Sequence, residues 1–159
     1  MDADQRIIDR LYEYAFAIDT RDWPAYRRLF ADRVWLDFEG ISGAPGAESS
    51  ADEWVASTAA IVEALDATQH VMSNPQVVVD GERARCRMYI QAMHFLWSAP
   101  GESVFTVGGW YDDTLVLTGD DWLVAGVTFN VFWRTGNEQV MALAQSRAAA
   151  GRSGHQASP

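Results

Sequence analysis

Apolar residues recur at helical spacing in three segments of the first half of the chain. They fall at every third or fourth position between residues 3 and 18, a segment that Asp2 precedes as a candidate N-cap. A second, short helix is expected after Asp22, and a third begins at the capping-box pair Ser50 and Glu53. The chain is therefore predicted to start with helices that each bury one face.

Beyond residue 66 the pattern changes to an alternation of apolar and polar positions, which is typical of strands. The dipeptide Asp80-Gly81 predicts a tight hairpin between two of them. Residues 39–49 are rich in Gly, Ser and Pro and are expected to form a mobile loop. The predicted strands cover residues 33–38, 69–72, 76–79, 83–97, 103–117 and 122–133.

Helices followed by a long antiparallel meander predict an α+β fold. We expect a cone-shaped domain over residues 1–147, in which the N-terminal helices pack on a strongly curved antiparallel sheet. The concave face of such a sheet encloses a pocket that side chains or a ligand must fill. Residues 148–159 are small and polar, and are expected to be a disordered C-terminal tail.

The charge of the chain excludes several partners. The 159 residues carry a formal net charge of −10, whereas binding to nucleic acid requires clustered cations. Every cation is an arginine, so lysine Schiff-base chemistry is excluded as well. The sequence shows neither a secretory signal core nor an apolar run long enough to span a membrane, so a cytoplasmic protein without membrane contact is expected.

Two histidines lie inside predicted strands and are candidates for proton transfer near neutral pH. His94 follows three apolar residues on its strand face, and His70 shares a face with Thr68 and Met72. Each is also consistent with a core histidine that donates to one backbone carbonyl.

Asp19 changes this balance. It lies on or beside the apolar stripe of the first helix, near the C-terminal end, where the helix dipole disfavours negative charge. A carboxylate that faces the interior needs a partner, and a histidine would supply one. Such a pair would also fix the tautomer of the imidazole. The alternative is that Asp19 only closes the turn before the second helix.

The chain resembles the SnoaL-like (nuclear transport factor 2-like) superfamily, and scytalone dehydratase in particular, over nearly its full length. The resemblance rests on Tyr12-Glu13-Tyr14 with Ile18 to Trp23, Thr68-Gln69-His70, Met93-His94, and Gly109-Trp110-Tyr111 with Trp122 to Trp133. It implies a cystatin-like fold. In scytalone dehydratase an Asp and a His form a pair and a second His faces them across the pocket. The resemblance places these roles on Asp19, His70 and His94.

The sequence departs from that enzyme where two tyrosines polarise the substrate carbonyl through water. Ile18 and Phe38 occupy those positions, and neither can donate a hydrogen bond. Tyr14, Tyr111 or Asn130 are expected to contribute to substrate binding instead, so the substrate must differ. The pocket is expected to be apolar and enclosed, with these residues near it: Phe16, Phe38, Met72, Met93, Phe95 and Trp110.

The sequence thus predicts a small-molecule lyase or isomerase that acts on a small apolar cyclic hydroxy-ketone, polyketide or steroid-like substrate. His70, oriented by Asp19, would remove a proton α to a carbonyl. His94 or His70 would then protonate the leaving hydroxyl or the new carbon. Attack on an internal carbonyl would make the protein a polyketide cyclase. Neither a cofactor nor a metal is expected.

Two other functions stay open. The superfamily includes non-catalytic ligand-binding members and assembly subunits, such as the β subunits of ring-hydroxylating dioxygenases. Two histidines and one carboxylate are also the ligand set of non-haem iron enzymes. The resemblance further implies a homo-oligomer, either a dimer or a trimer.

Overall fold

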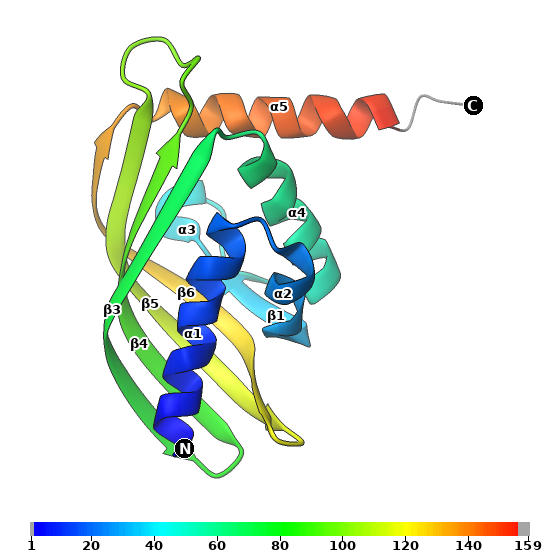
Figure 1. Ribbon diagram of the computed structural model, residues 1–159, viewed down its shortest axis with the longest axis vertical. Coiled ribbons are helices and arrows are strands. Elements are labelled where there is room, and N and C mark those ends of the chain that lie inside the picture. Colours follow the sequence, from blue (N-terminus) through cyan, green and yellow to red (C-terminus); the bar gives the residue numbers. More distant parts are fainter. Residues whose placement is uncertain (1, 156–159) are drawn as a thin grey trace.

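The computed structural model describes residues 2–155 and shows an α+β arrangement of five helices and six strands (Figure 1). In chain order the elements are α1 (Ala3–Asp19), α2 (Trp23–Arg28), β1 (Phe30–Asp37), α3 (Glu39–Ser42), β2 (Ala47–Ser50), α4 (Ala51–Glu63), β3 (Ala67–Asp80), β4 (Arg83–Phe95), β5 (Val104–Thr118), β6 (Asp121–Gly136) and α5 (Gln139–His155).

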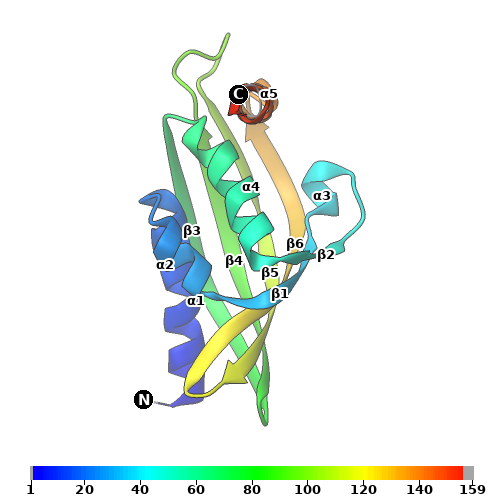
Figure 2. The same cartoon turned by 90° about the vertical axis from the view of Figure 1, so that its right-hand side faces the viewer.

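The six strands form one sheet in the order β2-β1-β6-β5-β4-β3. Only the contact between β1 and β6 is parallel, and all other neighbours are antiparallel. Figures 1 and 2 show that the long strands curve around α1, α2 and α4, while α5 crosses one end of the sheet. The predicted helices on a curved antiparallel sheet are therefore observed.

The core lies between the concave face of the sheet and these helices. On β4 every second side chain from Ala84 to Ala92 is buried, as the period of a strand requires. The inner face of α1 contributes Ile7, Leu11 and Ile18 at spacings of four and seven residues. Among the helices of residues 2–155, none combines the length and the apolar composition that crossing a bilayer needs.

The structure corrects three details of the sequence prediction. Residues 69–72 and 76–79 belong to one strand, β3, whose register shifts between Ser73 and Gln76 beside Asn74, a residue with φ +55°. Pro75 lies within this irregularity and interrupts the alternation of polar and apolar positions. The predicted loop at 39–49 contains the short helix α3 and pairs part of its length with β1 as β2.

The third correction concerns the end of the chain. Helix α5 extends to His155, so residues 148–155 are helical rather than the disordered tail that their composition suggested. The three consecutive alanines at 148–150 have the highest helix propensity of any residue type, which an argument from polarity alone overlooks. The expectation for residues 156–159 lies outside the described residues, and a domain boundary at residue 147 stays a prediction.

Candidate active site

The carboxylate of Asp19 binds His70 through two different groups. The Asp19 Oδ1 lies 2.7 Å from the His70 Nδ1, and the Asp19 Oδ2 accepts the backbone N–H of His70 at 2.7 Å. The hydroxyl of Thr68 donates to the same Oδ1 at 2.9 Å. The side chain of His70 is 6% exposed and that of Asp19 is 20% exposed. The last residue of α1 is thus fixed against β3 by three contacts.

The turn after α1 holds Asp19 in this place. Arg21 adopts a left-handed backbone conformation with φ +58°, which turns the chain toward α2. Its guanidinium donates to the carbonyls of Leu65 at 3.0 Å, and of Val62 and Asp66 at 3.4 Å. These carbonyls lie in the last turn of α4 and just beyond it, so α1, α4 and β3 are joined next to the carboxylate.

The environment of Asp19 keeps it ionised. Burial raises its pKa, but the hydrogen bonds and charge of His70 and the hydroxyl of Thr68 outweigh that effect, and the pKa is lowered from its usual value. An ionised carboxylate only accepts hydrogen bonds, so the Nδ1 of His70 carries a proton toward it. In the neutral ring the free lone pair is then on Nε2, the arrangement that a general base requires.

The second histidine faces the first from the neighbouring strand. His94 on β4 lies opposite Thr68 on β3, and the ring centroids of His70 and His94 are 5.9 Å apart. Burial, followed by the nearby His70, lowers the pKa of His94 to about 4, so its ring is neutral at pH 7. Within the described chain its Nδ1 has no hydrogen-bond partner. The site thus holds one imidazole paired with a carboxylate and a second whose Nδ1 has no partner among the described residues.

Both histidines line a cavity of about 280 Å³. Its walls come from α1, α3, α4, the concave face of the sheet and α5, and most of the lining side chains are apolar or aromatic. Of the residues predicted to bind substrate, these four line it: Tyr14, Ile18, Phe38 and Tyr111.

Two predicted residues lie elsewhere. Met72 is buried on β3 but is not part of the cavity wall. Asn130 follows the wall residue Phe129 on β6, so it points to the opposite face of the sheet, where it pairs with Trp110 of β5. Of the side chains expected near the pocket, only Phe38 lines it. Phe16 is 74% exposed on the outside of α1.

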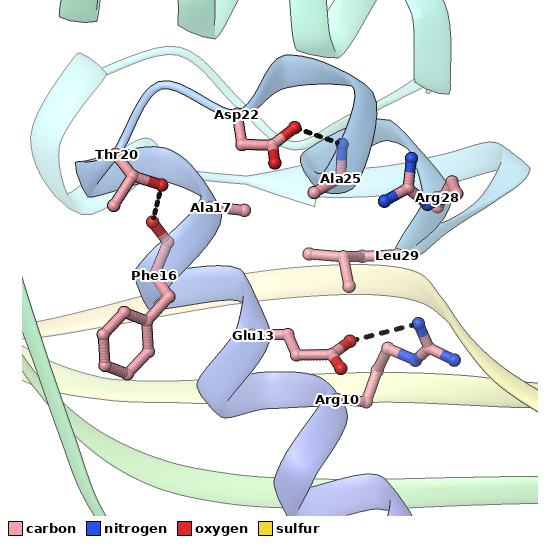
Figure 3. A pocket seen from close by; sticks show the side chains of 9 residues that line it. All are labelled: Arg10, Glu13, Phe16, Ala17, Thr20, Asp22, Ala25, Arg28 and Leu29. Atoms are coloured by element: carbon pink, nitrogen blue, oxygen red, sulfur yellow. Dashed lines mark hydrogen bonds and ion pairs between the residues drawn. The ribbon is translucent and has the colours of Figure 1, made fainter.

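A larger hollow, of about 420 Å³, lies on the outer side of α1 and α2 (Figure 3). Phe16 borders it, together with the ion pair in which Arg10 and Glu13 approach to 3.3 Å. Among its lining residues there is no histidine, so it lacks the two imidazoles of the first cavity.

Several wall residues were not predicted. Trp54 and Thr58 lie on α4, where the helical spacing indicates only a buried face, and Met141 and Gln145 belong to α5, a helix that the sequence pattern did not predict. No group of three or more His, Cys, Asp or Glu side chains in residues 2–155 is arranged to hold a metal ion, so the iron-site alternative lacks a donor set.

These features define a class of protein: a small α+β domain whose helices and curved sheet enclose a cavity that contains an Asp–His pair. The SnoaL-like domain family matches residues 1–128, and the chain belongs to this family. The predicted membership and the predicted cone-shaped fold are both confirmed.

Three relatives illustrate the similarity. The uncharacterised protein Rv2910c of Mycobacterium tuberculosis is 27% identical over 114 residues, which are 72% of this chain and 75% of that protein. The Kfla4162 protein of Kribbella flavida is 26% identical, with a TM-score of 0.79 over 89% of this chain and 97% of that one. A proposed scytalone dehydratase from Novosphingobium aromaticivorans is 18% identical and shares the fold, with a TM-score of 0.73 over 84% of this chain and 87% of that one.

Proposed function

We propose that this protein is a cofactor-independent lyase or isomerase that moves a proton on a small cyclic ketone or hydroxy-ketone. The observation that carries the proposal is the Asp19–His70 pair, which opens into a largely apolar cavity beside a second, neutral imidazole. A carboxylate that orients an imidazole is the arrangement that general base catalysis uses. The fold shared with a proposed scytalone dehydratase is consistent with this class of reaction.

In the proposed mechanism the Nε2 of His70 takes a proton from the carbon next to a carbonyl. The C–H electron pair moves into a carbon–carbon double bond, and the carbonyl oxygen becomes an enolate. Asp19 stabilises the imidazolium that forms, because the ionised carboxylate already accepts from its Nδ1.

The same imidazolium then returns the proton. If it reaches a hydroxyl on the neighbouring carbon, the C–O bond breaks and water leaves, which is a dehydration. If it reaches another carbon, the double bond shifts, which is an isomerisation. His94 is neutral at pH 7, since its pKa is about 4, and is therefore suited to hydrogen-bond the leaving group. An attack of the enolate on a second carbonyl would give a cyclisation.

The cavity limits the substrate. A volume of about 280 Å³ has room for about nine water molecules at ~30 Å³ each, which corresponds to a compact compound of one or two rings. The chain carries a net charge of −10, and no lysine or arginine lines the cavity, so a multiply anionic substrate is disfavoured.

The proposal is tested by proton exchange on cyclic ketones such as 1-tetralone. Incubation in D2O with the wild-type protein should replace the α protons by deuterium faster than buffer alone, as followed by NMR. His70→Ala should reduce the protein-dependent rate by about 100-fold or more, the typical contribution of a general base. Gln69→Ala, at an exposed neighbour on β3, is the matched control and should keep the rate. If His70→Ala exchanges as fast as the wild type, the mechanism is wrong.

We also propose that the chain forms a homo-oligomer through the outer face of the sheet. Two hollows on that face share Tyr89 and Phe132, which are 53% and 62% exposed, and Trp133 beside them is 41% exposed. Exposed aromatic side chains that adjoin one another are typical of protein–protein contacts. A second copy of the chain would bury them, as the homo-oligomer expected from the resemblance requires.

A further inference from the structure

The cavity has a second polar region besides the two histidines. Four side chains with polar atoms line this part of the cavity, namely Tyr14, Trp54, Thr58 and Tyr111. Tyr26 of α2 packs against Tyr14. We call these five residues the donor cluster. The ring centroids of Tyr14 and Tyr26 are 5.2 Å apart, and those of Tyr14 and Tyr111 are 5.9 Å apart.

The cluster lies deeper in the cone than the Asp–His pair. Tyr14 precedes Asp19 by five residues on α1, which is about 7.5 Å along the helix axis at 1.5 Å per residue. At the other end of α1, toward its C-terminus, α5 crosses the sheet (Figure 1). A ligand that enters beside α5 would therefore pass the histidines before it reaches the donor cluster.

Three polar atoms of the cluster are buried without a partner. Within residues 2–155 the Oη of Tyr26, the Nε1 of Trp54 and the Oγ1 of Thr58 make no hydrogen bond. Tyr26 is completely buried and Thr58 is 8% exposed. Buried polar atoms are nearly always paired, because an unpaired one costs on the order of 1–3 kcal/mol. Trp54 and Thr58 line the cavity, so a polar group bound there would pair their buried atoms, whereas the Tyr26 hydroxyl lies behind the wall, next to Tyr14, Trp54 and Thr58.

The tyrosines of the cluster remain donors at neutral pH. Burial raises the pKa of Tyr14, of Tyr26 and of Tyr111 above the ordinary value, so each hydroxyl keeps its proton. The side chains of Tyr14, Trp54 and Thr58 lie close enough to the Tyr26 hydroxyl to lower its pKa in part. The cluster is thus a connected group of hydroxyl and indole donors in a site of low polarity.

We propose that the donor cluster binds the carbonyl oxygen of the substrate and stabilises the negative charge that this oxygen gains when His70 removes the neighbouring proton. This inference rests on the proposed function and names the group that substitutes for the absent donors at Ile18 and Phe38. Donors fixed in a buried site stabilise a developing oxyanion strongly, because they need no reorganisation as the charge forms.

The consequence is a preferred class of ligand: a one- or two-ring ketone whose carbonyl points away from α5 and whose α carbon lies beside His70. A hydrocarbon of the same shape would fill the same apolar walls but would leave the cluster unpaired. The cavity should therefore distinguish the two by hydrogen bonding alone, since their contacts with the walls are otherwise the same.

The experiment compares the binding of 1-tetralone with that of tetralin, which has the same ring skeleton without the carbonyl, by calorimetry on the full chain. The wild type should bind 1-tetralone about tenfold more tightly than tetralin. Thr58→Val and Tyr14→Phe, which remove single hydroxyls from the cavity wall, should each reduce this ratio about threefold or more and leave the affinity for tetralin in place. Tyr12→Phe, at a partly exposed tyrosine of α1 outside the cavity, is the matched control and should keep the ratio.

His70→Ala separates this inference from the proposed function. The variant should keep the affinity ratio, because binding of the oxygen does not need the base. In one outcome the wild type prefers 1-tetralone to tetralin, and Thr58→Val loses that preference, without any protein-dependent proton exchange. That result would support binding of the carbonyl oxygen by the donor cluster and would show that the proton-transfer mechanism is wrong. If the wild type binds both probes equally, or does not bind 1-tetralone, the inference about the cluster is overturned, even where exchange is seen. The comparison of 1-tetralone with tetralin uses the wild type alone, so its result does not depend on whether any variant folds.

Discussion

Replacement of Asp19 by Asn tests how much the site depends on one carboxylate. The side chain accepts hydrogen bonds from the Thr68 hydroxyl at 2.9 Å and from the His70 backbone N–H at 2.7 Å, and it lies 2.7 Å from the His70 Nδ1. Asparagine has one acceptor oxygen, so its Nδ2 must face either the backbone N–H or the imidazole. In the second case His70 has to accept through Nδ1, and its proton moves to Nε2, where the base is needed.

Two magnitudes follow from this geometry. An orienting carboxylate of this kind contributes about 10³–10⁴ in rate, so Asp19→Asn should lose nearly all protein-dependent exchange on 1-tetralone. Hydrogen bonds to charged groups contribute on the order of 1.5–3 kcal/mol each, so the loss of about one of them should lower the free energy of unfolding by roughly 2 kcal/mol at pH 7.

The pH dependence of this loss has a definite sign. The pKa of Asp19 is lowered in the folded protein, so the unfolded chain takes up a proton at a higher pH than the folded one. The stability that the carboxylate contributes is therefore complete above the unfolded pKa, near 4, and is lost as the pH falls below it. Urea unfolding of wild type and Asp19→Asn should give curves that differ at pH 7 and approach one another below pH 4. Asp4→Asn, on the first turn of the same helix, is the control. Equal exchange rates in Asp19→Asn and wild type would refute the reasoning.

Three further predictions concern other parts of the molecule. Burial raises the pKa of Asp113 well above its usual value, so the free energy of unfolding should fall as the pH rises above the unfolded pKa, near 4, by at most about 1.4 kcal/mol per pH unit, and urea unfolding of Asp113→Asn should lack this slope. Phe132→Glu should dissociate the proposed oligomer. Light scattering of the protein as it elutes from a size-exclusion column should then give half the wild-type mass or less. An unchanged mass would argue against that interface. His94→Phe preserves the shape of the ring but removes its hydrogen bonds, and should slow exchange by about 10–100-fold while the wild-type fold is kept in circular dichroism.

The fold was predictable where the pattern of side chains is locally regular. Helix α1 and strands β4 to β6 each repeat their apolar positions with one period over several turns or pleats. The sequence alone therefore indicates whether each element is a helix or a strand and which of its faces is buried. Strand β3 was divided in two because Pro75 interrupts the alternation, whereas pairing with β4 continues on both sides of the interruption. Helix α5 was missed because its alanine, serine and glycine residues have no strong apolar stripe.

The Asp–His pair was also predictable, and for a physical reason. Asp19 falls on the buried stripe of α1, where a carboxylate needs a partner, and Thr68 and His70 follow on one face of the next long strand. Residues whose role depends on three-dimensional packing could not be found in this way. Tyr26, Trp54 and Thr58 occupy positions of an ordinary apolar stripe, and only the fold brings their polar atoms together. Asn130 was assigned to the pocket, although its neighbour Phe129 takes the inward position.

The central claim is that Asp19 orients His70 as a base that faces the cavity, and the most direct test is to observe the protons on the imidazole nitrogens. Long-range proton–nitrogen correlation spectra of the histidine side chains should be recorded at pH 7 for the wild type and for Asp19→Asn. We predict that the Nδ1 of His70 carries a proton hydrogen-bonded to the carboxylate in the wild type and that this signal changes in Asp19→Asn. A His70 ring with a bare Nδ1, or a spectrum that is the same in both proteins, would contradict the account.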